Sequence, residues 1–167
     1  MRWIESFLML CLMCTFASNA SAAELPTKKI LTLDAAKQGA AAAETEAKRR
    51  GSTVVIVVVD DGGHVLLLER LDDTQVASVE VGIGKARTAA IFRRPSKDFE
   101  DQVRNGRVAA LALPGATPLQ GGIPIVVDGK VLGAIGVSGN TPQEDEDIAK
   151  AGAAAIGTFT LSRGGGQ

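Results

Sequence analysis

The run from Thr53 to Val59 constrains the fold most, because all seven of its residues are β-branched. A strand of this composition has no polar face, so it has to be buried on both sides. A turn rich in aspartate and glycine follows at 60–64, and residues 65–70 predict a second strand that pairs with the first as a hairpin. The sheet therefore needs helices on both of its faces.

A second hairpin is predicted farther along the chain. Ile123–Val127 and Lys130–Val137 flank the dipeptide Asp128-Gly129, which tight hairpin turns favour. The order helix, hairpin, one or two helices, hairpin, helix predicts one α/β (α+β) domain with a largely antiparallel central sheet. The predicted helices span residues 32–50, 72–94, 96–104 and 141–159.

Three of these helices carry an apolar stripe that predicts the face each one buries. In the first helix, between an N-cap at Thr32 and a terminal Gly51, the stripe is Leu33, Ala36, Ala40, Ala43 and Ala47. In the second, expected to be capped by Asp72 or Asp73, it is Val76, Val79, Ile83, Ala86 and Ala90. In the last, which opens with a Thr141–Glu144 capping box, it is Ile148, Gly152, Ala155, Ile156 and Phe159.

The N-terminus has the features of a secretory signal. Arg2 precedes an apolar run at 7–17, which is too short to span a bilayer. Ala20-Ser21-Ala22 matches the small-residue pattern of a cleavage site, so we expect cleavage after Ala22 and a periplasmic or secreted product without membrane insertion. The expected divisions are a signal at 1–22, a leader at 23–30, one domain at 31–161 and a flexible tail at 162–167.

Composition excludes several kinds of site. Cleavage would remove both cysteines, all three methionines and the only tryptophan, and the chain has no tyrosine. The mature domain would then offer no thiolate, thioether or phenolate ligand and no cysteine-based zinc site. The formal net charge is −1 and no basic stripe is present, which argues against nucleic acid as a partner.

Five motifs carry a family resemblance. They are Val59-Asp-Asp-Gly-Gly-His64, Gly84-Lys-Ala-Arg-Thr-Ala-Ala90, Phe92-Arg-Arg-Pro95, Gly121-Gly-Ile-Pro-Ile125 and Gly133-Ala-Ile-Gly-Val-Ser-Gly139, with Asp145 beyond them. In this order they resemble the GlcG/HbpS family, which also occurs as the C-terminal domain of PduO-type corrinoid adenosyltransferases. The resemblance covers about residues 30–160 and implies a profilin-like α/β/α sandwich that forms symmetric homo-oligomers. Members include extracellular haem-binding proteins, and haem breakdown has been ascribed to some, so it also implies a haem-related function.

His64 is the only histidine of the chain. With cysteine, methionine and tyrosine missing from the mature domain, it is the one ordinary strong axial ligand for haem iron. Because no Cys-x-x-Cys-His motif is present, any haem would be held non-covalently. A polar turn residue without a ligand is the slightly favoured interpretation, since histidine is common in turns. A threonine, lysine, glutamate or water is the alternative ligand for haem iron.

Lys85, Arg93 and Arg94 are the predicted partners of ligand carboxylates. Lys85 lies within a helical stripe, and the residues around it lack the rest of a phosphate-binding loop. An ion pair between Lys85 and an acid of the segment 144–147 is an equally good explanation of this lysine.

Two further candidate sites lie near the start of the last helix. Ser138 and Asn140 precede it, and its free N–H groups are suited to an anion, although the capping box competes for them. Glu144 and Asp145 are candidate oxygen ligands for a hard cation such as iron or calcium. The favoured alternative for these two acids is a solvated first turn, stabilised by the helix dipole.

The leading hypothesis is an exported homo-oligomer that binds a small molecule, with haem or a related tetrapyrrole as the best candidate. A crevice for this flat ligand is expected between the apolar strands and the helices rich in alanine and glycine. Gly133, Gly136 and Gly139 mark either this crevice or the close packing of a helix, and packing is slightly favoured. The alternative functions are a haem-degrading or small-metabolite-processing enzyme, and an interaction protein that partners a membrane sensor.

The predicted signal fixes the start of the exported product. When the full chain is expressed in a Gram-negative host, we expect the periplasmic protein to begin at Ala23, because the processing enzyme requires small residues before the cut. Intact-mass spectrometry and N-terminal sequencing measure this directly. Ala22→Asp is the control and should leave uncleaved precursor. A wild-type product that retains Met1 and stays in the cytoplasm would contradict the prediction.

Overall fold

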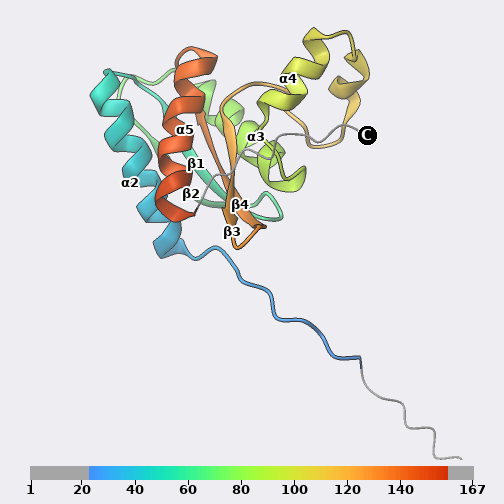
Figure 1. Ribbon diagram of the computed structural model, residues 1–167. Helices are drawn as coiled ribbons and strands as arrows, with labels where there is room; N and C mark the ends of the chain where they lie inside the picture. Colours follow the sequence, from blue (N-terminus) through green and yellow to red (C-terminus); the bar gives the residue numbers. More distant parts are fainter. Residues whose placement is uncertain (1–22, 158–167) are drawn as a thin grey trace, which may run out of the picture.

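The computed structural model describes residues 23–157, which place a four-stranded antiparallel sheet between two layers of helices (Figure 1). The order of the strands in the sheet is β2–β1–β4–β3. This arrangement confirms the predicted α/β/α sandwich with an antiparallel sheet. The strands are β1 (Val55–Asp60), β2 (Val65–Arg70), β3 (Gly122–Val127) and β4 (Lys130–Ser138).

Strand β1 is the central element, as its β-branched run predicts. It pairs with β2 on one side and with β4 on the other. Every residue from Val54 to Val59 is fully buried. Alternate side chains enter the two hydrophobic clusters, with Ile56 and Val58 on one face and Val55, Val57 and Val59 on the other.

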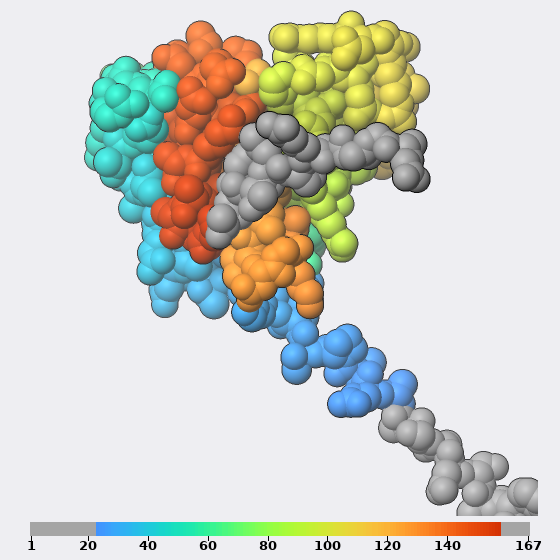
Figure 2. All heavy atoms as spheres, viewed as in Figure 1, coloured from blue at the N-terminus to red at the C-terminus, as the bar shows by residue number. Residues whose placement is uncertain are grey.

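Helices α2 (Leu33–Arg50) and α5 (Pro142–Ile156) lie side by side on one face of the sheet (Figures 1 and 2). The Thr32 hydroxyl accepts a hydrogen bond from the Ala35 N–H, and Gly51 ends α2 in the left-handed conformation, as predicted. The four alanines of the predicted stripe are fully buried, which lets α5 approach closely. Leu33 is the exception, because it lies in the first turn and is 47% exposed.

Helix α3 (Ser78–Ile91) covers the opposite face and packs on β1, β3 and β4. It meets β4 at very short range: a Cβ on Gly136 would lie 2.4 Å from the Gly82 carbonyl oxygen and 2.5 Å from the Ala86 nitrogen. Two backbones can approach this closely only where glycine and alanine face each other. The small residues of α3 therefore decide which of its faces is buried.

The predicted stripe of this second helix is partly wrong. Ala86 and Ala90 are buried, but Val76 is 76% exposed and precedes the helix, while Val79 and Ile83 are only half-buried. Valine and isoleucine would hold the helix away from Gly136, so they lie at its side. The helix also starts later than predicted, without a side-chain cap.

The second hairpin has the predicted tight turn, since Asp128 and Gly129 both have positive φ angles, 50° and 72°. Between α3 and this hairpin lie α4 (Lys97–Arg104) and a short 3₁₀ helix, η1 (Val108–Ala112). These two elements form the projection at the upper right of Figure 1.

Helix α5 begins at the predicted N-cap, Thr141, whose hydroxyl accepts a hydrogen bond from the Glu144 N–H at 3.4 Å. The Glu144 carboxylate accepts from this hydroxyl at 2.8 Å instead of from the Thr141 N–H, and Pro142 occupies the first turn. Its buried face is partly as predicted: Ile148 and Gly152 are buried and Ile156 is half-buried, but Ala155 is exposed, and Asp145 and Glu146 are buried as well. Phe159, the predicted signal at 1–22 and the predicted tail at 162–167 lie outside the described residues. Within the described part, no helix is both long and apolar enough to cross a membrane.

The close contact between α3 and β4 gives a stability prediction. Gly136→Ala should lower the free energy of unfolding by about 1–3 kcal/mol, because the new methyl group meets the α3 backbone and forces the helix outward. Urea denaturation followed by circular dichroism measures the change. Ala154→Ser, which adds one atom at an exposed position of α5, is the control. Equal stability of Gly136→Ala and the wild type would contradict the described packing.

Candidate functional site

A buried ion pair joins the two helix layers. Lys85 on α3 places its Nζ 2.7 Å from Asp145 Oδ2 on α5, and both side chains are almost fully buried. The same Nζ donates to the carbonyl oxygen of Val137, at the end of β4, with a distance of 3.0 Å. One cation thus connects the helix on one face of the sheet, a strand end and the helix on the other face.

The Asp145 carboxylate is also held by backbone groups. Its Oδ1 accepts a hydrogen bond from the Asn140 N–H at 3.0 Å. Burial raises the pKa of Asp145 above its usual value, and Lys85 and the backbone N–H groups of Asn140 and Gly139 only partly oppose this effect. The N–H groups before α5 therefore do hold an anion, and that anion belongs to the chain itself.

Two glycines leave the space in which the ion pair lies. Gly121 has a φ of +124°, and a Cβ there would lie 3.0 Å from Lys85 Nζ. A Cβ on Gly122 would overlap the Lys85 carbonyl oxygen at 2.1 Å. The motif Gly121-Gly122 is explained by this close approach of the loop to α3.

The predicted ligand residues near this pair are engaged within the protein. Lys85 pairs with Asp145, which is the structural alternative left open by the sequence. Ser138 is buried in β4, and the Asn140 side chain donates to the Ser52 hydroxyl at 2.8 Å. A ligand carboxylate at Lys85 would have to displace Asp145, so the ligand roles of these residues stay predictions.

The acidic start of α5 is only partly solvated. Glu144 is half-buried and contacts the cap residue Thr141, whereas Asp145 and Glu146 are buried and pair with Lys85 and Lys150. Residues 23–157 contain no group of three or more metal-ligating side chains. The metal role of Glu144 and Asp145 stays a prediction.

The crevice expected between the sheet and the small-residue helices is closed, which corrects that expectation. A Cβ on Gly133 would lie 2.2 Å from the Val59 carbonyl oxygen, and one on Gly139 would lie 2.4 Å from that of Thr53. With Gly136 packed on α3, all three strand glycines serve close packing. The favoured alternative for these glycines is therefore confirmed, and a flat ligand has no room there.

His64 lies in the turn between β1 and β2, and its side chain is 75% exposed. The Asp60 Oδ1 accepts hydrogen bonds from the N–H groups of Gly62 and His64, both at 2.9 Å, which fixes the turn. Burial acts to raise the pKa of Asp60, but these N–H groups and the imidazole outweigh it and hold the pKa below its usual value. The His64 Nδ1 lies 3.3 Å from Asp60 Oδ1, so the carboxylate orients the ring and leaves Nε2 available.

An incompletely covered apolar surface begins beside His64. Helix α3 packs on β1, β3 and β4. The face of β2 on the same side of the sheet is therefore only partly covered. On this side Leu68 of β2 and Val79 and Ile83 of α3 pack against the same buried cluster, and all three are half-buried. Val65 is 44% exposed. It pairs with Val59, whose side chain faces α3. We call these four residues, Val65, Leu68, Val79 and Ile83, the α3–β2 shelf.

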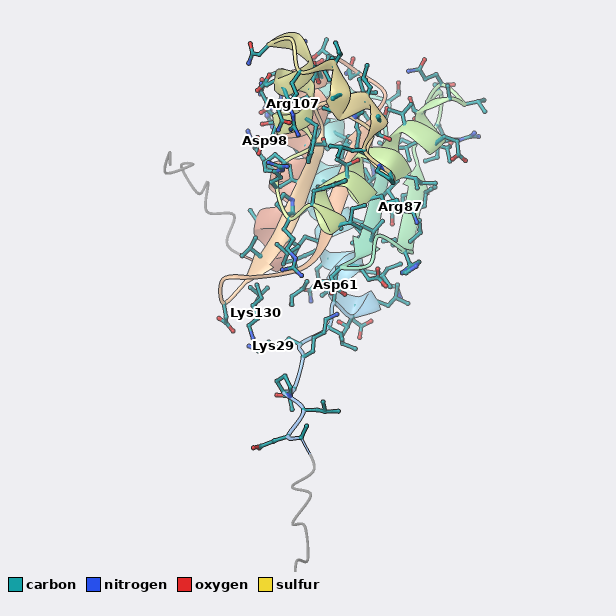
Figure 3. All side chains as sticks on the ribbon, turned by 90° about the vertical axis from the view of Figure 1, so that its right-hand side faces the viewer. Lys29, Asp61, Arg87, Asp98, Arg107 and Lys130 are labelled. Atoms are coloured by element: carbon teal, nitrogen blue, oxygen red, sulfur yellow. The ribbon has the colours of Figure 1, made fainter. Side chains whose placement is uncertain are left out.

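Arg87 lies beside the turn that contains His64. It is exposed on α3, and its Cγ would lie 2.7 Å from a Cβ on Gly63. Figure 3 shows Arg87 on the flank of the domain, above Asp61, which belongs to the same turn as His64. Arg87 was not predicted as a ligand residue from the sequence, although its spacing of four from Ile83 places both on one side of the helix.

The two predicted arginines after α3 have different surroundings. The Arg94 guanidinium lies over the ring of Phe99, 4.2 Å from its centre, and stabilises the start of α4. Arg93 is exposed and lines a hollow of about 520 Å³ near the leader. Lys85 instead pairs with Asp145, so the three predicted ligand cations have three different settings.

Comparison with known proteins identifies the family. The family model described as "Haem degrading protein HbpS-like" matches residues 31–154. The chain belongs to the HbpS-like family. The match spans every described helix and strand except the end of α5.

Relatives agree with this assignment. "Protein GlcG" of Escherichia coli strain K12 is 48% identical over 75 residues, which cover 45% of this chain and 56% of GlcG. The chain thus matches little more than half the length of this curated HbpS-like relative. An uncharacterised 15.0 kDa protein of Citrobacter freundii is 39% identical over 91 residues, which are 52% of this chain and 64% of that protein.

Solved structures share the whole fold. A double mutant of Streptomyces reticuli HbpS has a TM-score of 0.75 and 33% identity, with coverage of 83% of this chain and 95% of HbpS. Klebsiella pneumoniae ORFY has a TM-score of 0.74 and 29% identity, with coverage of 81% of this chain and 97% of ORFY. A PduOC:haem complex has a TM-score of 0.70 and 27% identity, with coverage of 77% of this chain and 96% of PduOC.

The buried pair of this HbpS-like domain gives a pH prediction. Lys85→Met should lower the free energy of unfolding at neutral pH by about 3–5 kcal/mol, because it leaves the Asp145 carboxylate buried without its cation. Since the pKa of Asp145 is raised in the folded state, this deficit relative to wild type should shrink as the pH falls through that pKa.

Urea denaturation at several pH values measures both effects. The double variant Lys85→Met/Asp145→Leu is the matched control, and it should recover most of the lost stability because neither charge remains buried. A deficit that is small at neutral pH, or that grows on acidification, would contradict the assigned pair.

Proposed function

We propose that this HbpS-like protein binds haem, or a related tetrapyrrole, non-covalently at the surface formed by His64 and the α3–β2 shelf. The observation that carries the proposal is the orientation of His64. Its Nδ1 faces Asp60, so Nε2 is available at the edge of an apolar surface. A carboxylate–histidine pair of this kind favours metal ligation through the other ring nitrogen.

The neighbouring residues fit a haem group. Leu68, Val79 and Ile83 form an apolar strip on which a flat macrocycle can pack. Arg87, beside the turn, is suited to a propionate because a guanidinium donates two parallel hydrogen bonds to a carboxylate. The chain's own residues would ligate the iron, orient the ring and neutralise a propionate, and the haem would supply the iron chemistry.

The comparisons support haem rather than another flat ligand. The family model carries the description of a haem-degrading protein, and PduOC, at 27% identity, has been solved as a haem complex. The exposure of His64 and of the shelf indicates an open site, so a second copy of the chain covering the haem would complete it. Homo-oligomerisation is part of the proposal, since β2 is an edge strand whose outer side is free of any other strand of the described sheet.

Titration with hemin tests the site. The wild-type protein, purified from the periplasm without a histidine tag, should shift the Soret band with a saturable stoichiometry. His64→Ala should weaken binding at least about tenfold or abolish the shifted band, because no other histidine exists in the chain. Asp60→Asn should retain binding with an affinity lower by about 10–100-fold, because it disturbs only the orientation of the ring.

A matched pair of surface variants tests whether hemin binding depends on the shelf or on any exposed apolar side chain. Val65→Ser should weaken hemin binding, whereas Leu119→Ser, at a position with nearly the same exposure, should not (44% and 43%). Absence of a Soret shift in the wild type would remove the haem proposal. A shift that is identical in His64→Ala would remove His64 as the ligand.

The enzymatic alternative rests on the description of the family model. It is distinguished by adding reductant and oxygen to the hemin complex and measuring released iron with a chelator. Loss of the Soret band with release of one iron per haem would favour haem degradation, and a stable complex would favour binding alone. Export and a partnership with a membrane sensor remain proposals, and the start of the periplasmic product tests the first of them.

A further inference from the structure

The hollow lined by Arg93 lies at the end of the domain where the leader joins it. Its walls come from four segments: the leader at 26–29, Asp61 in the first turn, Arg93 after α3, and the second hairpin at 129–132. Its volume of about 520 Å³ is within the range of small-molecule sites. Figure 3 shows three of its residues, Lys29, Asp61 and Lys130, gathered at this end of the molecule. We call it the leader pocket.

The charges of the leader pocket do not balance. Four cations line it, and two of them are neutralised: Lys28 contacts Asp61, and Lys29 lies 2.5 Å from Asp128 Oδ2, just outside the pocket. The other two, Arg93 and Lys130, form no salt bridge among residues 23–157, and the charge of Lys130 acts on the same Asp128 that pairs with Lys29. Four cations against two acids, Asp61 and Asp128, leave a net charge of +2 at the hollow.

Arg93 is held there in an unfavourable backbone conformation. Its φ is +55°, in the left-handed region that glycine usually occupies after a helix. A side chain with a Cβ is strained at such an angle, and strained residues tend to cluster at binding sites. The strain would be relieved by glycine at no loss of packing, because Arg93 is exposed. What glycine would remove is the guanidinium that lines the pocket.

We propose that the leader pocket binds a small organic dianion, of the dicarboxylate class. One carboxylate would take the paired N–H donors of Arg93, and the other would lie against the Lys130 ammonium. Pro26, Val131 and Leu132 provide an apolar wall for the short carbon chain between the two groups. This site is separate from the haem proposal, which depends on His64, Arg87 and the shelf.

Succinate is the probe, and the exported protein is titrated by calorimetry at low ionic strength. Amide shifts of Gly129, Val131 and Leu132 in NMR spectra should report the same binding event. Arg93→Gly should weaken succinate binding at least about tenfold while leaving the melting temperature equal or higher, because the positive φ is no longer strained. Arg93→Lys, which keeps the charge and the backbone strain, should lose only part of the affinity because it lacks the planar fork.

Arg107→Gln is the control, since it removes one positive charge at the opposite end of the domain (Figure 3). Inorganic phosphate tests whether the site binds any anion. Succinamide, which has the same carbon chain but no charge, tests whether packing of the chain alone is enough. Succinate binding that Arg93→Gly and Lys130→Gln weaken, and that Arg107→Gln does not, supports the site. The proposal is overturned by no binding at millimolar succinate, by equal losses in all three variants, or by phosphate binding as tightly as succinate.

Discussion

The buried contact between Lys85 and Asp145 is the interaction that connects both helix layers to the end of β4, and breaking it from one side leaves a charge buried without its partner. Helices α3 and α5 lie on opposite faces of the sheet, and this pair joins them at the end of β4. A buried ion pair is costly to desolvate, so it is retained only where the geometry satisfies both groups. Here the Val137 carbonyl and the Asn140 N–H supply the remaining hydrogen bonds. The pair therefore fixes how α3 and α5 are placed relative to the strand end between them.

Close packing of small residues makes this geometry possible. Gly136 admits the backbone of α3, and Gly121 and Gly122 admit the loop that passes over Lys85. The resulting interior is filled, so the two surfaces available for ligands lie outside it. One is the turn at His64 with the α3–β2 shelf, and the other is the leader pocket. Both border the residues between β1 and β2, so one short turn influences both surfaces.

The sequence predicted the architecture because its strongest signals are local. The β-branched run, the Asp128-Gly129 turn and the N-cap at Thr141 each specify an element through neighbouring residues alone. The buried face of α3 could not be predicted in this way. It is set by the approach of Gly82 to Gly136, a contact between residues far apart in the chain, and hydrophobicity alone favoured Val79 and Ile83 instead.

The candidate site was predictable only in part for the same reason. His64 was identifiable because it is the single histidine, and a pairing of Lys85 with an acid of α5 was one of two open interpretations. Which acid pairs, and the burial of Asp145 with it, depend on the rotation of α5 about its axis. Arg87 was missed, since its position beside Gly63 results from the packing of α3 against the turn.

The central functional claim is that His64 ligates haem iron, and the single histidine allows a direct measurement. The protein, produced without a tag, can be labelled with ¹⁵N-histidine only, loaded with hemin and studied by electron–nuclear double resonance. We expect a hyperfine coupling between the ferric iron and one ¹⁵N nucleus of His64. A fully loaded complex without any ¹⁵N coupling would contradict the claim, because the chain contains no other histidine to provide the ligand.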